Sequence, residues 1–162
     1  MKAAMLSIRP EWCEKIASGK KTIEVRKTKP KLETPFKCYI YCTVGGIKKM
    51  QKDYLEESFE RGKVIGEFIC DKIYELDPIN HAPDDLEKQS CLTREDIVAY
   101  LKGVGFGWHI SDLVIYDKPK EPSEFTGLRN TKFGREPVSL VRPPQSWCYV
   151  EDGVFGDRLR EL

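Results

Sequence analysis

The chain has 162 residues, which fits one domain. Hydrophobic residues make up 40% and charged residues 33% of it, enough for a core beneath a well-solvated surface. The net charge of +1 excludes a global field that would attract nucleic acid or a membrane, so any such binding needs a local basic patch. No stretch approaches the roughly 20 apolar residues that span a bilayer. Residues 1–10 lack the long apolar region of a signal peptide. We therefore expect a cytoplasmic protein with no membrane partner.

The N-terminal segment predicts a strand followed by a short helix. Residues 2–8 are typical of a strand, and Pro10 suits the first position of a helix. Apolar residues then recur with helical spacing up to Ala17, and Gly19 is a suitable C-terminal cap. The chain should therefore leave this helix through a glycine turn.

The segment 19–26, Gly-Lys-Lys-Thr-Ile-Glu-Val-Arg, combines that turn with an alternating strand. Ile23 and Val25 point to one side, whereas Thr22, Glu24 and Arg26 point to the other. The pattern predicts a half-buried strand with one polar face, preceded by two lysines.

The remaining patterns predict a mixed fold with no regular strand–helix alternation. Thr93 and Asp96 resemble a capping box at a helix start. Further strands are expected at 37–44, 63–76, 108–116 and 146–151, a glycine turn at 103–107, polar or basic loops at 77–89 and 130–144, a short helical turn within 118–125, and a surface helix or irregular excursion at 48–61. About six strands and two to four short helices favour an α+β fold, a small mixed β-barrel.

The six cysteines form no Cys-x-x-Cys pair. They are Cys13, Cys38, Cys42, Cys70, Cys91 and Cys148. A zinc site usually has two close ligand pairs, and the chain has only two histidines, His81 and His109. We expect reduced, largely buried thiols that pack as small hydrophobes, and neither a metal nor a cofactor.

Three segments resemble the ASCH domain family of the PUA-like superfamily. They are Leu6-Ser7-Ile8-Arg9-Pro10, the run from Ile16 to Lys27, and Trp108-His109-Ile110-Ser111-Asp112. The order of strand, short helix, Gly-Lys turn and Glu-x-Arg strand matches the family as well. The resemblance implies one PUA-like domain over residues 1–162, with excursions near 46–62 and 77–106. It also implies a cleft, formed by the first helix and segment 19–26, that binds RNA or a nucleotide-like ligand.

The same resemblance suggests an enzyme as an alternative. One bacterial branch deacylates N4-acylated cytidine with a motif lysine, a threonine three residues later and a distant glutamate. Lys21 matches that lysine, but Glu24 occupies the position of the threonine, so the hydroxyl nucleophile is not carried over. Another member is a metal-dependent ribonuclease, for which this chain offers no clear ligand set. The candidate catalytic residues are Lys21, Glu24 and Glu67.

The residue types of segment 19–26 also suit a ligand site without the family. Lysine supplies a flexible point charge, and arginine a rigid fork for phosphate or base edges. Glu24 can orient these cations or accept a hydrogen bond from a base amine. The alternative is an ordinary solvated strand, because most exposed charge pairs contribute little. The candidate ligand-binding residues are Ser7, Arg9, Lys20, Lys21, Thr22, Glu24, Arg26, Trp108 and His109.

Three of the candidates have an equally plain structural interpretation. Trp108 is either a stacking platform for a base or a core residue. His109 is either a general acid or base or a hydrogen-bonded structural histidine. Glu67 is either a distant catalytic carboxylate or an outward-facing charge on a strand.

Basic loops decide whether the site has a phosphate-binding rim. The residues concerned are Lys27, Lys29, Lys31, Arg129, Lys132, Arg135 and Arg142. They form a rim if they converge, and are solubility charges if they do not. The leading hypothesis is a monomeric module that binds RNA or a modified nucleotide. The alternatives are a hydrolase on acylated cytidine or RNA, and a protein-interaction module, which the two excursions alone support.

Overall fold

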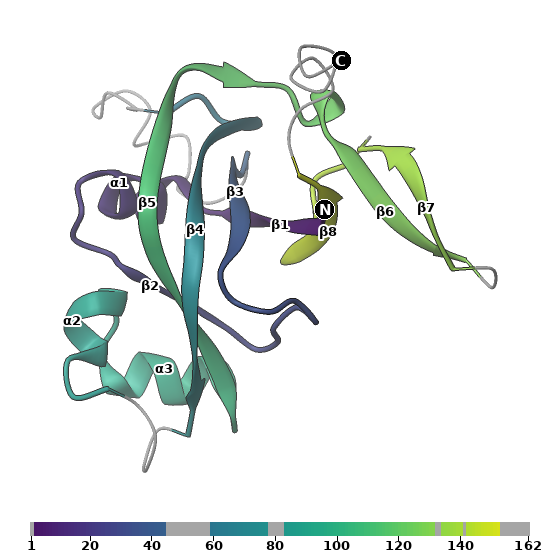
Figure 1. The fold of residues 1–162 in the computed structure, drawn as a ribbon. Helices are drawn as coiled ribbons and strands as arrows, with labels where there is room; N and C mark the ends of the chain where they lie inside the picture. Colours follow the sequence, from purple (N-terminus) through teal and green to yellow (C-terminus); the bar gives the residue numbers. More distant parts are fainter. Residues whose placement is uncertain (1, 45–58, 78–82, 132–133, 141, 153–162) are drawn as a thin grey trace.

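The computed structural model describes residues 2–44, 59–77, 83–131, 134–140 and 142–152. Its eight strands form one strongly curved sheet in the order β2-β5-β4-β3-β1-β8-β6-β7 (Figure 1). The strands are β1 (Lys2–Ile8), β2 (Ile23–Arg26), β3 (Phe36–Cys42), β4 (Lys63–Leu76), β5 (Gly105–Lys120), β6 (Thr126–Thr131), β7 (Gly134–Ser139) and β8 (Trp147–Glu151). The helices are α1 (Pro10–Ala17), α2 (Leu86–Ser90), α3 (Arg94–Leu101) and the 3-10 turn η2 (Pro122–Glu124).

The mixed α+β class is as predicted, but the sheet has more strands than expected and is open. β1 pairs parallel with β3, and the other pairings are antiparallel. β2 and β7 are the end strands of the sheet and do not pair with each other. The predicted mixed β-barrel of about six strands is therefore corrected to an open sheet of eight strands, and we call its curved part from β2 to β8 the open barrel.

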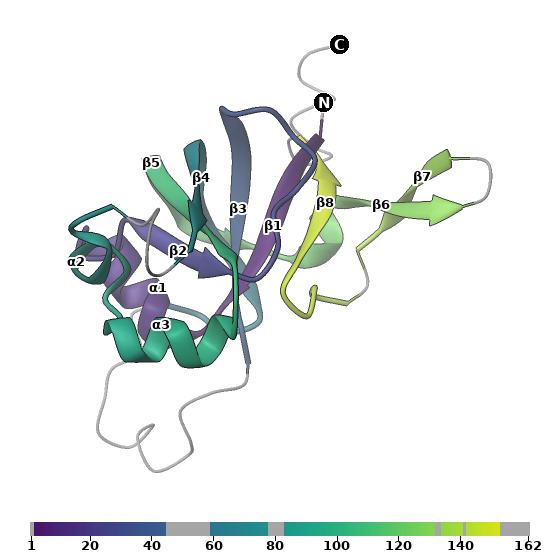
Figure 2. The same cartoon turned by 90° about the horizontal axis from the view of Figure 1, so that it is seen from below.

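The two extra strands span residues 126–139, most of which fall in the predicted basic loop at 130–144. β6 and β7 form a hairpin that extends away from the open barrel (Figures 1 and 2). The hairpin joins the sheet through a β6–β8 register that contains the single pair Gly127 and Val150. It therefore covers little of the core, and its strands lack the apolar alternation that marks a half-buried strand.

The predicted signals are confirmed at both ends of α1 and at the start of α3. Pro10 opens α1, and Gly19 follows its C-cap with φ +81°. Thr93 and Asp96 form the capping box of α3, with Asp96 N donating to Thr93 Oγ1 at 3.1 Å. The sequence analysis missed α2, which interrupts the predicted polar loop at 77–89.

Residues 105–107 of the predicted glycine turn at 103–107 are instead the beginning of β5. A Cβ on Gly105 would lie 2.2 Å from Leu101 Cδ2, and one on Gly107 would lie 3.0 Å from Ile23 Cγ2. These glycines therefore let α3 and β2 approach β5 closely, which is a packing role within a strand.

Two apolar cores lie on opposite faces of the central strands. The inner core, on the concave side, includes Leu6, Ile40, Phe68 and Trp108. A third cluster joins Ile23 and Val25 of β2 to α2 and α3. All six cysteines are free thiols, and four of them are buried, as expected. No helix in the described part of the chain is long and apolar enough to cross a membrane.

Candidate functional site

Strand β2 alternates as predicted, but both of its faces are buried. Ile23 and Val25 pack against α2 and α3. On the other face, the exposed fractions of Glu24 and Arg26 are only 7% and 8%, and that of Lys21, just before the strand, is 2%. The expectation of a solvated polar face is wrong, because the curvature of the sheet brings the end of β1 and the start of β8 beside this face. We call Lys21, Glu24 and Arg26 the inner cluster.

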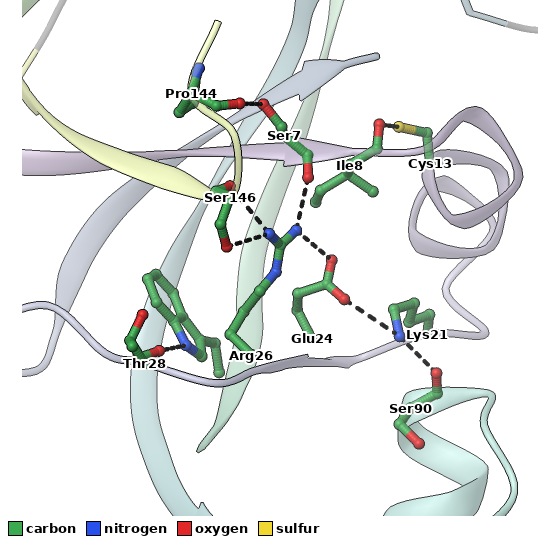
Figure 3. Close-up of polar contacts among 11 residues, drawn as sticks. Ser7, Ile8, Cys13, Lys21, Glu24, Arg26, Thr28, Ser90, Pro144 and Ser146 are labelled. Carbon is green, nitrogen blue, oxygen red and sulfur yellow. Dashed lines mark hydrogen bonds and ion pairs between the residues drawn. The ribbon is translucent and has the colours of Figure 1, made fainter. Parts of the chain in front are cut away.

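Arg26 joins β2 to two strands with which β2 shares no backbone ladder. Its Nη1 donates to the carbonyl oxygen and to Oγ of Ser146, both at 3.0 Å, and its Nη2 donates to the carbonyl oxygen of Ser7 at 2.8 Å (Figure 3). The guanidinium therefore connects β2 to the end of β1 and to the residue before β8. Because Ser146 is exposed, Arg26 lies directly beneath the surface.

Lys21 is fixed from the opposite side of the cluster. Its Nζ donates to the carbonyl oxygen of Ser90, at the end of α2, at 2.6 Å, and lies 3.6 Å from Glu24 Oε1 (Figure 3). The ring of Trp12 on α1 lies 5.1 Å from the same ammonium group. An ammonium has three donors, so one of them has no acceptor among the described residues.

Glu24 makes the weakest contacts of the cluster. Its Oε2 lies 3.3 Å from Arg26 Nη2 and its Oε1 lies 3.6 Å from Lys21 Nζ. Charge-assisted hydrogen bonds of this kind are usually about 2.7–2.9 Å long. The cations are thus fixed by backbone carbonyls, and the carboxylate keeps acceptor capacity. Two cations and one carboxylate leave the buried cluster with a net positive charge.

The thiol of Cys13 on α1 interacts with one carboxylate of the inner cluster and with one outside it. A hydrogen bond with Cys42 and burial raise the pKa of the Cys13 thiol, and the negative charges of Glu24 and Glu11 raise it further. Both carboxylates therefore lie within electrostatic reach of the same group on α1. Glu11 Oε2 is buried and has no hydrogen-bond partner among the described residues.

The other residues predicted near segment 19–26 have different roles. Ser7 Oγ donates to the carbonyl oxygen of Pro144, and Thr22 Oγ1 donates to Gln89 Oε1 on α2. The side chains of Arg9 and Lys20 are exposed next to α1. Ser7 and Thr22 thus lie at the edges of the inner cluster. Ser7 connects β1 to the loop before β8, and Thr22 connects the start of β2 to α2.

Trp108 lies in the inner core with an exposed fraction of 0%, which fits the structural interpretation. Its Nε1 donates to the carbonyl oxygen of Thr28, and its ring meets that of Trp147 edge-on at 5.7 Å. Trp147 is half-buried and follows Ser146 directly. Trp147 is not among the predicted site residues, although a tryptophan at the start of the last predicted strand is a signal that could have marked it.

Glu67 is not brought to Lys21. Its strand neighbour Phe68 points into the inner core, so Glu67 points to the opposite face of β4. There it accepts a hydrogen bond from Tyr116 at 2.8 Å and lies 3.2 Å from Lys37 Nζ, which also lies 3.5 Å from Asp152. Lys37, Glu67 and Asp152 form the outer cluster, which fits the interpretation of Glu67 as an outward strand charge.

His109 also lies outside the inner cluster. Its Nδ1 lies 2.7 Å from Asp71 Oδ1, and both side chains are partly exposed. Burial acts to raise the pKa of Asp71, but the hydrogen bond and the charge of His109 outweigh it and lower that pKa. This pair fits a hydrogen-bonded structural histidine.

The basic residues do not all converge. Lys27, Lys29 and Lys31 are exposed on the loop after β2, beside the inner cluster, and Arg142 is exposed in the loop before β8. Positions 129 and 135 lie on the β6–β7 hairpin, which leads away from the open barrel, and position 132 is outside the described residues (Figure 1). No group of three or more His, Cys, Asp or Glu side chains that could hold a metal ion occurs in the described ranges.

Solved structures with a similar fold come from the ASCH protein of Zymomonas mobilis. A tyrosine-to-phenylalanine mutant of it matches with a TM-score of 0.58 at 20% identity, covering 100% of this chain and 99% of that one. The ASCH crystal structure without a stated mutation matches with a TM-score of 0.58 at 20% identity, covering 99% and 94%. No curated protein matches the chain. The family model of the ASCH domain matches residues 6–127, so the chain belongs to the ASCH domain family.

Proposed function

We propose that this protein binds single-stranded RNA or a modified nucleotide at the inner cluster. The observation that carries the proposal is the burial of Lys21, Glu24 and Arg26 with a net positive charge. A buried charge without a full set of partners is costly, so an anionic or acceptor-rich group that enters the cluster is favoured. Phosphate, ribose and base edges supply such acceptors.

The contacts assign a role to each member of the cluster. Lys21 has a donor left for a phosphate or carbonyl oxygen. A ligand would approach Arg26 past the exposed Ser146, whose carbonyl oxygen and Oγ accept hydrogen bonds from the guanidinium. Glu24, with its long contacts, accepts a hydrogen bond from an exocyclic amine of a base. The half-buried ring of Trp12 forms one wall of the site.

A titration of fluorescein-labelled single-stranded RNA tests the proposal. Lys21→Gln and Arg26→Lys keep side-chain length or charge, and are expected to weaken binding about tenfold or more, the cost of losing one hydrogen bond to a charged group. Lys88→Gln, an exposed change on α2, is the matched control. Circular dichroism confirms that each variant is folded. Folded variants that bind RNA like the control would reject the site.

Hydrolysis is a second candidate, favoured by the buried contact between Lys21 and Glu24. A lysine beside a carboxylate in a water-poor site can stabilise developing negative charge while the carboxylate transfers a proton. Incubation with N4-acetylcytidine and with RNA, with and without divalent metal, tests for turnover. Product formation that persists in Glu24→Gln would reject this role. Of the two excursions that support a protein-interaction module, 46–62 lies mostly outside the described residues, whereas 77–106 contains α2, α3 and the start of β5.

A further inference from the structure

The loop between β2 and β3 is fastened across one end of the open barrel by aromatic side chains. Thr28 accepts hydrogen bonds at its carbonyl oxygen from Trp108 Nε1, at 3.3 Å, and at its Oγ1 from Trp147 Nε1, at 2.8 Å. The backbone N–H of Lys31 donates to the hydroxyl of Tyr149 at 2.8 Å. In the view from below, the loop runs along this end of the open barrel (Figure 2). Its path is therefore fixed by β5 and β8.

The lysines of this loop alternate with its anchoring residues. Lys27, Lys29 and Lys31 are exposed, whereas Pro30 is buried and Thr28 is fixed by the two indoles. The loop backbone that carries the three lysines is therefore anchored, and its first lysine directly follows Arg26.

Aromatic rings lie beside the same lysines. Lys27 Nζ lies 5.1 Å from the ring centroid of Tyr100, and Lys29 Nζ lies 5.4 Å from that of Phe106. Tyr100 is 43% exposed on α3. Farther along, the half-buried rings of Trp147 and Tyr149 meet edge-on at 5.1 Å. Lysines and aromatic rings thus share one surface, which we call the aromatic–basic track.

We propose that the aromatic–basic track binds the continuation of a single strand of nucleic acid whose first nucleotide occupies the inner cluster. This inference rests on the proposed function. Grooves that bind single strands combine backbone-tracking cations with aromatic rings on which bases stack. Here Lys27 and Lys29 each cover a ring in the free protein, and a cation–π contact at an exposed site is weak. When the ammonium moves to a phosphate, the ring is uncovered for a base.

The aromatic rings favour nucleic acid over an acidic protein as the partner. A row of lysines alone would attract either of them. The exposed Tyr100 and the half-buried Phe106 give planar apolar faces next to the cations, which suit stacked bases. Arg26 and Ser146, which connect the inner cluster to the surface, are direct chain neighbours of Lys27 and Trp147. The track thus begins one residue along the chain from both groups that connect the inner cluster to the surface.

Two labelled single-stranded RNAs, of three and twelve nucleotides, separate the track from the inner cluster. The variant carries Lys27→Gln, Lys29→Gln and Lys31→Gln. Its matched control carries Lys88→Gln, Lys102→Gln and Lys118→Gln, which remove the same charge from exposed positions on other elements. For the twelve-nucleotide RNA we expect the Kd of the track variant to rise about tenfold or more. The slope of log Kd against log salt should fall by about 2, at roughly 0.7 per phosphate contact.

A second pair of variants tests stacking without a change of charge. Tyr100→Ala should weaken binding of the long RNA by about fivefold or more, the lower range for loss of one stacked base. Val98→Ala, at an exposed position on the same helix, should leave its Kd unchanged. Neither variant should affect the three-nucleotide RNA.

The outcomes distinguish this inference from the proposed function. Wild-type protein that binds both RNAs, with a track variant that matches its control, overturns the track and leaves the inner cluster intact. Wild-type protein that binds neither RNA overturns both. Polyglutamate that displaces the long RNA at the same concentration as unlabelled RNA identifies a general acidic partner and overturns a nucleic-acid track.

Discussion

The inner and outer clusters place the same residue types on one sheet with opposite results. In the inner cluster, Lys21 and Arg26 bind backbone carbonyls and leave Glu24 loosely paired, with every member more than nine-tenths buried. In the outer cluster, Lys37 contacts the side chains of Glu67 and Asp152, and the side chains of all three members are 25–32% exposed. The difference shows that the face of the strand, rather than the residue type, decides whether an ion pair is buried and connects strands or stays partly exposed.

Solvent access explains this contrast. Water screens the outer cluster, so a lost partner is replaced at little cost. The inner cluster has no such replacement, and a missing partner leaves a buried charge or carbonyl without compensation. The inner cluster is therefore suited both to connect strands and to receive a ligand, whereas the outer cluster adds a modest surface contact.

The largest expected effect follows from removing Arg26. Arg26→Met keeps much of the side-chain volume but removes the guanidinium from Glu24 and from the carbonyl oxygens of Ser7 and Ser146. Among the described residues, Glu24 then keeps only Lys21, and the Ser146 carbonyl keeps only the N–H of Ser7. We expect a loss of about 3–5 kcal/mol in the free energy of unfolding, as for other broken buried pairs. Urea denaturation measures it, with the exposed neighbour Lys27→Met as control. Equal denaturation midpoints for the two variants would show that Arg26 does not connect the strands.

Replacing Glu24 should cost less, because its contacts are long. Glu24→Gln leaves Lys21 and Arg26 on their backbone acceptors and removes only the contacts at 3.3 and 3.6 Å. We expect a loss of about 2 kcal/mol, the range for hydrogen bonds to charged groups. Glu33→Gln at an exposed position is the control in the same denaturation assay. A loss as large as that of Arg26→Met would mean that the carboxylate, and not the carbonyls, fixes the cations.

The outer cluster gives the contrasting measurement. Lys37→Met and Glu67→Gln, alone and together, form a double-mutant cycle across the 3.2 Å contact. Proximity to Glu67 and Asp152 raises the pKa of Lys37 although burial opposes this, so the lysine is charged at neutral pH. We expect a coupling free energy below about 1 kcal/mol, as for other partly exposed pairs. A coupling of 3 kcal/mol or more would remove the distinction between the two clusters.

The sequence predicts the elements of the inner cluster better than its environment. The period of two in segment 22–26 correctly separates Ile23 and Val25 from Glu24 and Arg26. The burial of the inner cluster could not be predicted, because the groups that cover it belong to α2 and to the residue before β8, which lie far along the chain. Backbone carbonyls such as that of Ser90 carry no sequence signal at all.

The errors in the fold have a similar cause. β6 and β7 pair mainly with each other, so their polar and basic sequence lacks the alternation of a strand that covers a core. The side of Glu67, in contrast, follows from the neighbouring Phe68 by strand alternation alone. Local periodicity thus gives the orientation of a residue, and the distant chain decides whether that orientation is buried.

The smallest expected effect concerns the pair of His109 and Asp71, whose carboxylate is more exposed than those of the inner and outer clusters. The pKa of Asp71 is lowered in the folded state, so the pair contributes stability above the unfolded pKa of about 3.9 and loses it as the pH falls through the folded value. His109→Gln should therefore lower Tm slightly at pH 5.5, and the difference from wild type should shrink towards pH 3. Thermal unfolding over this range measures it, with Asp117→Asn on the same strand as control. A difference in Tm that stays constant with pH would assign the effect of His109 to packing and not to its contact with Asp71.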